Sequence, residues 1–193
     1  MMAEVFGSSD CERFRAGFLR QPVNALSSLA FLPAGWAVLR AGPGRTELAV
    51  TTMSVGVSSF LAHGPGGRFA HWFHDASIAW LLTALARPPG WIRWAIHGTV
   101  GWLFARAPSS RKPLSILLAG WAFHRVFRNH RSDPAFRRAA AIAGLATLIG
   151  NLSRTGGPLC RPDSLLQGHA AWHVLAALAL ARFGAAPWRT DDG

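Results

Sequence analysis

Acidic residues are scarce in this chain of 193 residues: nine Asp and Glu stand against twenty Lys and Arg, and all charged residues together make up 15%. Tyr is absent, although there are nine Trp and twelve Phe. The first twenty residues are mixed and charged and contain no apolar stretch, so the sequence predicts no signal peptide. No internal repeat or low-complexity tract is present, and the length suits one domain over residues 1–193, with a short N-terminal segment (1–20) and a short C-terminal tail (184–193).

The formal net charge of +11 comes almost wholly from Arg. A soluble nucleic-acid binder spreads such charge over one water-facing surface. Here the Arg residues fall in short clusters between apolar runs, which is typical of a polytopic membrane protein. We therefore expect no nucleic-acid partner and an integral, multi-pass membrane location. The alternative, a soluble protein with these runs as core helices, is less favoured because the runs approach the about 20 residues that a bilayer requires.

About seven apolar runs are separated by breakers such as AGPGR, HGPGGR and RPPG. The runs predict an all-α fold, a polytopic seven-transmembrane helix bundle. The densest basic cluster, residues 124–138, indicates a cytoplasmic loop, with the N-terminus outside and the C-terminus in the cytoplasm. The seven runs cover residues 22–39, 48–62, 72–86, 91–105, 113–126, 139–152 and 165–183.

Polar residues inside apolar runs are costly in a bilayer, and several of them fall at matching ends of these runs. His169 and His173 are four residues apart, so they project from one helix face. Ser59 and His63 have the same spacing at the end of the second run, and Asp75 begins the third. In an up-and-down bundle these ends lie on one side, so the residues converge. Three histidines form a zinc site with a vacant position, and a neighbouring aspartate is able to take a proton from bound water.

Each of these residues also has a plainer interpretation. His169 and His173 would then be interfacial histidines that are hydrogen-bonded to loops. The Ser59 hydroxyl would bond to its own helix backbone, which is common in membrane helices. Asp75 would orient a ligand histidine without taking part in the chemistry.

Two further histidines, His71 and His74, are rival ligands that could replace His63 in principle. His74 is adjacent to Asp75 and points away from it on a helix, which argues against both residues facing one metal. We interpret the remaining histidines as ordinary surface residues: His97, His124 and His130.

At these residues the chain resembles the alkaline ceramidases and their wider superfamily, which includes the adiponectin-receptor type proteins. The stretches SSFLAH, HDAS and HAAWH match the family pattern of Ser four residues before His, Asp about a dozen residues on, and His-x-x-x-His on the seventh helix. The N-terminal part of the chain also resembles the N-terminal part of this family, including Asn24 in the first helix, over the stretch DCERFRAGFLRQPVNALSSLAF. The resemblance implies a seven-helix membrane protein with an intramembrane zinc, which hydrolyses the linear amide bond of a lipid such as ceramide or another N-acyl lipid.

The resemblance also implies a role for each matching residue. His63, His169 and His173 would hold zinc, and Asp75 would act as general base toward the zinc-activated water. Ser59 would hydrogen-bond the carbonyl oxygen of a lipid substrate within the bilayer. The Arg-, Ala- and Gly-rich composition suggests a bacterial host, and the expected location is therefore the bacterial inner membrane. The resemblance implies a place in sphingolipid or other lipid metabolism. Nothing in the sequence indicates an oligomeric state.

Two functions other than hydrolysis remain open. The first is a non-catalytic seven-helix receptor or metal-binding membrane protein, because part of the superfamily is better known for signalling. The second is bis-histidine haem binding, which leaves Asp75 and one histidine of the His169 and His173 pair unexplained.

Some eukaryotic ceramidases of this family carry a calcium site before the first helix. Asp10 and Glu12 remain here as weak calcium candidates, but Phe14 and Gln21 fall where further oxygen ligands are expected. Calcium takes about six to eight oxygen ligands, which makes a full site doubtful. In the alternative, the two carboxylates pair with neighbouring Arg residues.

The two cysteines are Cys11, before the first run, and Cys160, before the last. Seven spans put both on the outer side, where a periplasm or lumen favours disulfides. A bridge would tie the start of the chain to the helix with two zinc ligands and preorganise the site. The alternative is two unrelated thiols.

Overall fold

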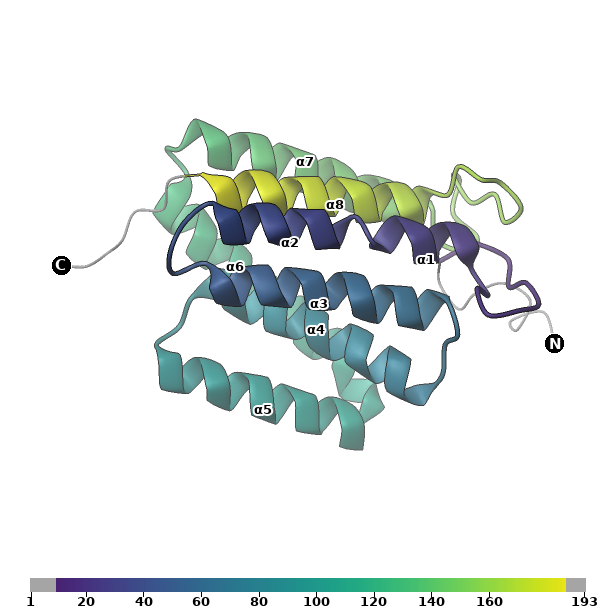
Figure 1. The fold of residues 1–193 in the computed structure, drawn as a ribbon, viewed down its shortest axis with the longest axis horizontal. Coiled ribbons are helices and arrows are strands. Elements are labelled where there is room, and N and C mark those ends of the chain that lie inside the picture. Colours follow the sequence, from purple (N-terminus) through teal and green to yellow (C-terminus); the bar gives the residue numbers. More distant parts are fainter. Residues whose placement is uncertain (1–9, 187–193) are drawn as a thin grey trace.

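The computed structural model describes residues 10–186, so the N-terminal segment and C-terminal tail expected from the sequence lie partly outside the described residues. Figure 1 shows the rods of this all-helical chain lying roughly side by side, each reversing the direction of the one before. The elements are α1 (Pro22–Ser28), α2 (Phe31–Arg40), α3 (Thr46–His63), α4 (Arg68–Ala86), α5 (Gly90–Arg106), η1 (Pro108–Ser110), α6 (Arg111–His130), α7 (Pro134–Leu152) and α8 (Gly168–Ala185).

Local sequence signals explain where these helices begin and end. The Asp133 carboxylate accepts a hydrogen bond from the Ala135 N–H at 2.8 Å, and Pro134 occupies the first position of α7. Between α3 and α4, Gly66 and Gly67 have φ values of +71° and +97°, a region that favours glycine. This tight reversal returns the chain so that the first turns of α4 lie beside the end of α3.

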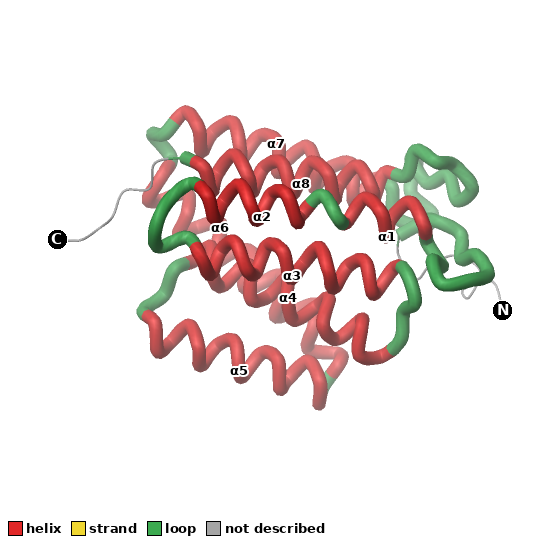
Figure 2. Tube along the Cα trace, in the orientation of Figure 1, coloured by secondary structure: helices red, strands yellow, loops and turns green. Residues whose placement is uncertain are grey.

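The first rod is broken, since α1 and α2 are separated at residues 29–30, as Figure 2 shows. α2 packs against both α3 and α8. The main core forms between them from large side chains that are almost wholly buried, with Leu81 added from α4: Phe31, Val38, Leu48 and Val55. Burial of these side chains holds the end of α3 and the start of α8 in register.

The prediction of a seven-transmembrane polytopic bundle is wrong. Within the described residues, one stretch alone is long and apolar enough to cross a membrane, Pro22–Arg40 near the N-terminus. Helices do occupy all the predicted runs, but charged residues shorten their apolar lengths: Arg93 lies inside α5, and α6 begins with Arg111 and Lys112. The cytoplasmic location of residues 124–138 was predicted from a topology of seven spans. It stays a prediction, and the seven-span topology no longer supports it.

Candidate metal centre

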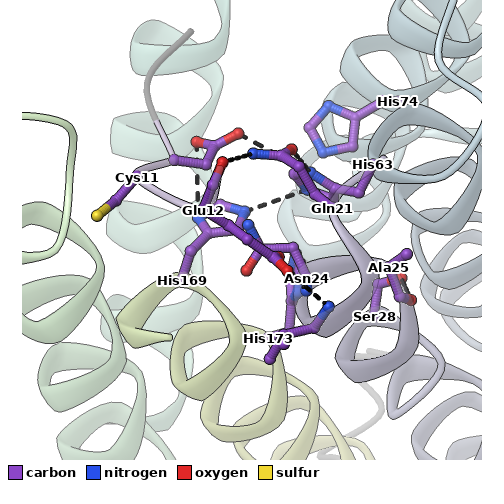
Figure 3. Close-up of polar contacts among 12 residues, drawn as sticks. Cys11, Glu12, Gln21, Asn24, Ala25, Ser28, His63, His74, His169 and His173 are labelled. Carbon is purple, nitrogen blue, oxygen red and sulfur yellow. Dashed lines mark hydrogen bonds and ion pairs between the residues drawn. The ribbon is translucent and has the colours of Figure 1, made fainter. Parts of the chain in front are cut away.

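Three histidines meet at the end of the bundle where α3 ends and α8 begins (Figure 3). His63 is the last residue of α3, and His169 and His173 are one turn apart near the start of α8. One ligand atom from each lies within 4.8 Å of the others, and the Nε2 atoms of His63 and His169 are 3.3 Å apart. His63 and His173 are buried and His169 is partly buried. The three predicted ligands therefore lie close enough to bind one metal ion.

Hydrogen bonds on the outer side of two rings set their orientation. Nδ1 of His63 is 2.9 Å from Gln21 Oε1, an acceptor, so this nitrogen carries the proton. Nδ1 of His173 is 2.9 Å from the Ser27 hydroxyl, which itself donates to the Asn24 carbonyl. The serine oxygen therefore accepts from His173. Both Nε2 atoms are left with a lone pair, the form in which an imidazole binds metal.

Burial supports the same protonation state. It lowers the pKa of His63 and His173 well below the ordinary value of histidine, and the neighbouring histidines lower each pKa further. The pKa of His169 is lowered as well, again chiefly by burial. Nε2 of His173 is buried and has no hydrogen-bond partner within the described part of the chain. An unpaired lone pair of this kind is unfavourable unless a ligand or ion meets it, so the residues fit a metal ion.

Asp10 lies beside two of the rings. Its carboxylate oxygens are 3.7 Å from His169 Nδ1 and 3.9 Å from His63 Nδ1. The next residue, Cys11, forms a disulfide with Cys160 in the loop between α7 and α8. The bridge therefore ties the segment that carries Asp10 to the loop that leads into α8.

Glu12, the other calcium candidate, is fully buried and holds the start of α1. Its two carboxylate oxygens accept hydrogen bonds from the backbone N–H groups of Val23 and Asn24, at 2.9 and 2.8 Å. Its backbone carbonyl also accepts from the side-chain amide of Gln21 at 2.8 Å. Burial raises the pKa of Glu12, while the two backbone hydrogen bonds oppose that rise. Glu12 thus positions Gln21, and through it the His63 ring.

Ser59 lies on α3 one turn before His63 and is fully buried. Its hydroxyl has no hydrogen-bond partner among residues 10–186, so a bond to its own helix backbone does not occupy it. A buried hydroxyl without a partner is available to a ligand at this end of the bundle.

Asp75 lies on α4, and both of its carboxylate oxygens have protein partners. One oxygen is 3.2 Å from Nδ1 of His74, and the other accepts from Arg111 at 3.2 Å. The His74 ring, expected to point away from Asp75, instead contacts that carboxylate and lies edge-on to His63, with 6.1 Å between ring centroids. The interactions of Asp75 with the centre thus run through His74.

An apolar pocket of about 380 Å³ lies next to the histidines. Phe31 and Trp172 line it, and their rings also pack against His173, at centroid distances of 6.1 and 5.3 Å. The rest of the wall comes from α3, α4, α6, α7 and α8, with side chains such as Val55, Leu81, Phe136 and Phe183. The pocket suits a hydrocarbon chain in size and lining.

Comparison of the chain with protein-family models, with curated proteins and with solved structures finds no match. The resemblance to the alkaline ceramidases therefore stays a prediction that rests on the motifs. The spacing of the histidines predicted the cluster, but not its outer partners. Asp10, Gln21 and Ser27 come from the chain before α1 and from α1 itself, where no periodic pattern marks which side chain turns inward.

Proposed function

We propose that this protein is a zinc-dependent hydrolase that cleaves the amide bond of a lipid, such as ceramide or another N-acyl lipid. The observation that carries the proposal is the convergence of one ring nitrogen from each of His63, His169 and His173, together with the absence of a hydrogen-bond partner for the buried Nε2 of His173 among residues 10–186. Imidazole nitrogens that converge in a buried site favour the binding of a cation. Imidazole nitrogens suit zinc well.

His63, His169 and His173 would hold the zinc, which would supply, at an open coordination position, a Lewis acid that activates water. The protein contributes positioning and proton transfer around that position. Ser59, with its unpaired buried hydroxyl, is the proposed donor to the amide carbonyl oxygen. Asp75 is the proposed general base, and its contact with His74 provides a route to the centre.

A lipid substrate is supported by the apolar pocket that adjoins His173 through Phe31 and Trp172. Large apolar side chains are also exposed around the outside of the bundle, including Trp36, Trp91, Trp102, Leu117 and Leu148. Exposed apolar surface on this scale is typical of proteins that meet a membrane or a partner. We propose that the protein works at a membrane, from which the substrate enters the pocket.

A non-catalytic metal-binding protein or receptor is the second candidate. One observation favours it: both carboxylate oxygens of Asp75 contact protein groups, His74 and Arg111, as expected of a residue with a structural role. The two candidates share the metal and differ in turnover. Haem binding, the third candidate, would produce a visible absorption band in the purified protein.

The experiment is hydrolysis by purified zinc-loaded protein in detergent micelles, offered ceramide and a panel of N-acyl amino lipids. Release of fatty acid is followed by mass spectrometry, with His124→Ala as a control because His124 is exposed on α6. We expect turnover by the parent and by His124→Ala, and a loss of about 100-fold or more in Asp75→Asn with zinc retained. Zinc-loaded protein that releases no fatty acid from any member of the panel would contradict the hydrolase and leave the receptor.

A further inference from the structure

His74 turns one edge of its ring toward the metal centre without being one of the three converging ligands. Its centroid is 6.1 Å from that of His63, with the ring planes at 75° (Figure 3). Nε2 of His74 is buried, and no other group in the described chain pairs with it. A buried ring nitrogen is expected to have a hydrogen-bond partner, so this atom calls for one that the protein does not supply.

The opposite edge of the ring is held firmly. Asp75 Oδ1 is 3.2 Å from Nδ1 of His74, so this nitrogen carries the proton and Nε2 carries the lone pair. The other carboxylate oxygen of Asp75 accepts from Nη1 of Arg111 at 3.2 Å. Arg111 in turn donates to the Phe104 carbonyl through Nε and Nη2, at 3.0 and 2.8 Å. The chain of contacts from α5 and α6 to α4 fixes the direction in which Nε2 of His74 points.

We propose that His74 accepts a hydrogen bond, through Nε2, from a ligand bound at the three-histidine centre, and that Asp75 acts on this ligand through the His74 ring. The inference rests on the proposed function for the presence of a metal at that centre. It assigns the ligand a chemical class: the ligand carries an O–H or N–H group on the side that faces α4. Asp75 itself does not contact the ligand in this arrangement, because its two carboxylate oxygens are engaged by His74 and Arg111.

The test compares two small ligands that bind metal and differ in hydrogen-bond donors. Acetohydroxamate carries an N–H donor, whereas azide carries none. Purified protein is loaded with Co²⁺, whose visible bands report the ligand field, and the Kd of each ligand is measured by titration. The variants are His74→Ala, His74→Gln, Asp75→Asn and, as a control that also removes an imidazole, His124→Ala, because His124 is exposed on α6.

We expect His74→Ala to keep the cobalt affinity and visible bands of the parent, to weaken acetohydroxamate about tenfold, and to leave azide unchanged. His74→Gln retains a side-chain acceptor and should recover part of the loss. Asp75→Asn should show a smaller loss, because it frees the ring without removing it. His124→Ala should match the parent for both ligands.

Two results would overturn the inference: acetohydroxamate affinity that is unchanged in His74→Ala, or loss of the cobalt bands in that variant, which would make His74 a metal ligand. Thermal melting of each variant, with His74→Gln as the milder change, separates these results from misfolding. If the parent binds cobalt and the ligand series behaves as expected but no N-acyl lipid is hydrolysed, the proposed function fails and the role of His74 stands. If the parent binds no cobalt, both fail.

Discussion

A polar cluster lies at each end of α3, and the two clusters differ in burial and in the charges of their members. Near the start of α3, Glu47 forms an ion pair with Arg93 at 2.8 Å, and Nε2 of His97 lies 3.8 Å from the same carboxylate. At the other end, His63 meets His169 and His173.

In the first cluster an ion pair joins opposite charges, although Nε2 of His97 and Oε1 of Glu47 have no hydrogen-bond partner among residues 10–186. In the second, one nitrogen from each of three imidazoles lies within 4.8 Å of the others, an arrangement that a cation stabilises. Buried histidine alone therefore does not mark a functional site. The convergence of several imidazole nitrogens separates the two ends of α3, because the cluster around Glu47 contains one histidine and the other contains three.

Removal of one ligand histidine is expected to have the largest effect. His173→Ala leaves two imidazoles, which cannot complete a tetrahedral site, so zinc affinity should fall by several orders of magnitude. His97→Ala, on α5 beside the start of α3, should leave zinc affinity unchanged. Competition with a fluorescent zinc chelator measures both variants. Equal losses in the two would show that zinc binding does not depend on the three-histidine centre.

Loss of the disulfide is expected to have the next largest effect. Replacing both Cys11 and Cys160 by Ser frees the segment with Asp10 from the loop before α8. Loss of a native disulfide typically costs about 2–5 kcal/mol of stability. We expect a fall of this size in denaturant unfolding of the zinc-free protein, and weaker zinc binding by the folded variant. A variant with unchanged zinc affinity would show that this tether does not preorganise the centre.

Removal of the hydrogen-bond partner of His63 Nδ1 should have a more moderate effect on zinc affinity. Gln21→Ala removes the acceptor at 2.9 Å that orients the ring, and loss of such a partner typically weakens metal binding about 10- to 100-fold. Gln21→Glu keeps an acceptor and should retain most of the affinity. The same chelator competition applies. If Gln21→Ala binds zinc as tightly as the parent, the orientation of His63 is set by its backbone alone.

The smallest effect should arise at the other end of α3. Burial raises the pKa of Glu47, while Arg93 opposes that rise, so the folded chain holds this proton more tightly than the unfolded chain. The unfolding free energy should therefore fall as pH rises above about 4.5, until the folded group has ionised. Glu47→Gln should make that fall shallower, as urea unfolding across this pH range would detect. A fall of unchanged steepness in the variant would exclude Glu47 as a source of it.

Much of the metal centre could be predicted because it depends on helix geometry. His169 and His173 share a face by their spacing, and reversal of direction at each loop brings His63 to the same end. The helices were predicted for the same reason. The number of membrane-spanning helices was predicted wrongly, because an apolar run has the same sequence pattern whether protein or lipid covers it. The contact of His74 with Asp75 depends on side-chain torsions, which no sequence period encodes.

The most direct test of the three-histidine centre is the zinc content of the purified protein together with X-ray absorption at the zinc edge. We expect about one zinc per chain, with three imidazole nitrogens at about 2.0–2.1 Å and one lighter ligand, and no zinc in His173→Ala. Full zinc occupancy in His173→Ala, or a zinc shell without imidazole, would contradict the assignment of His63, His169 and His173 as the metal ligands.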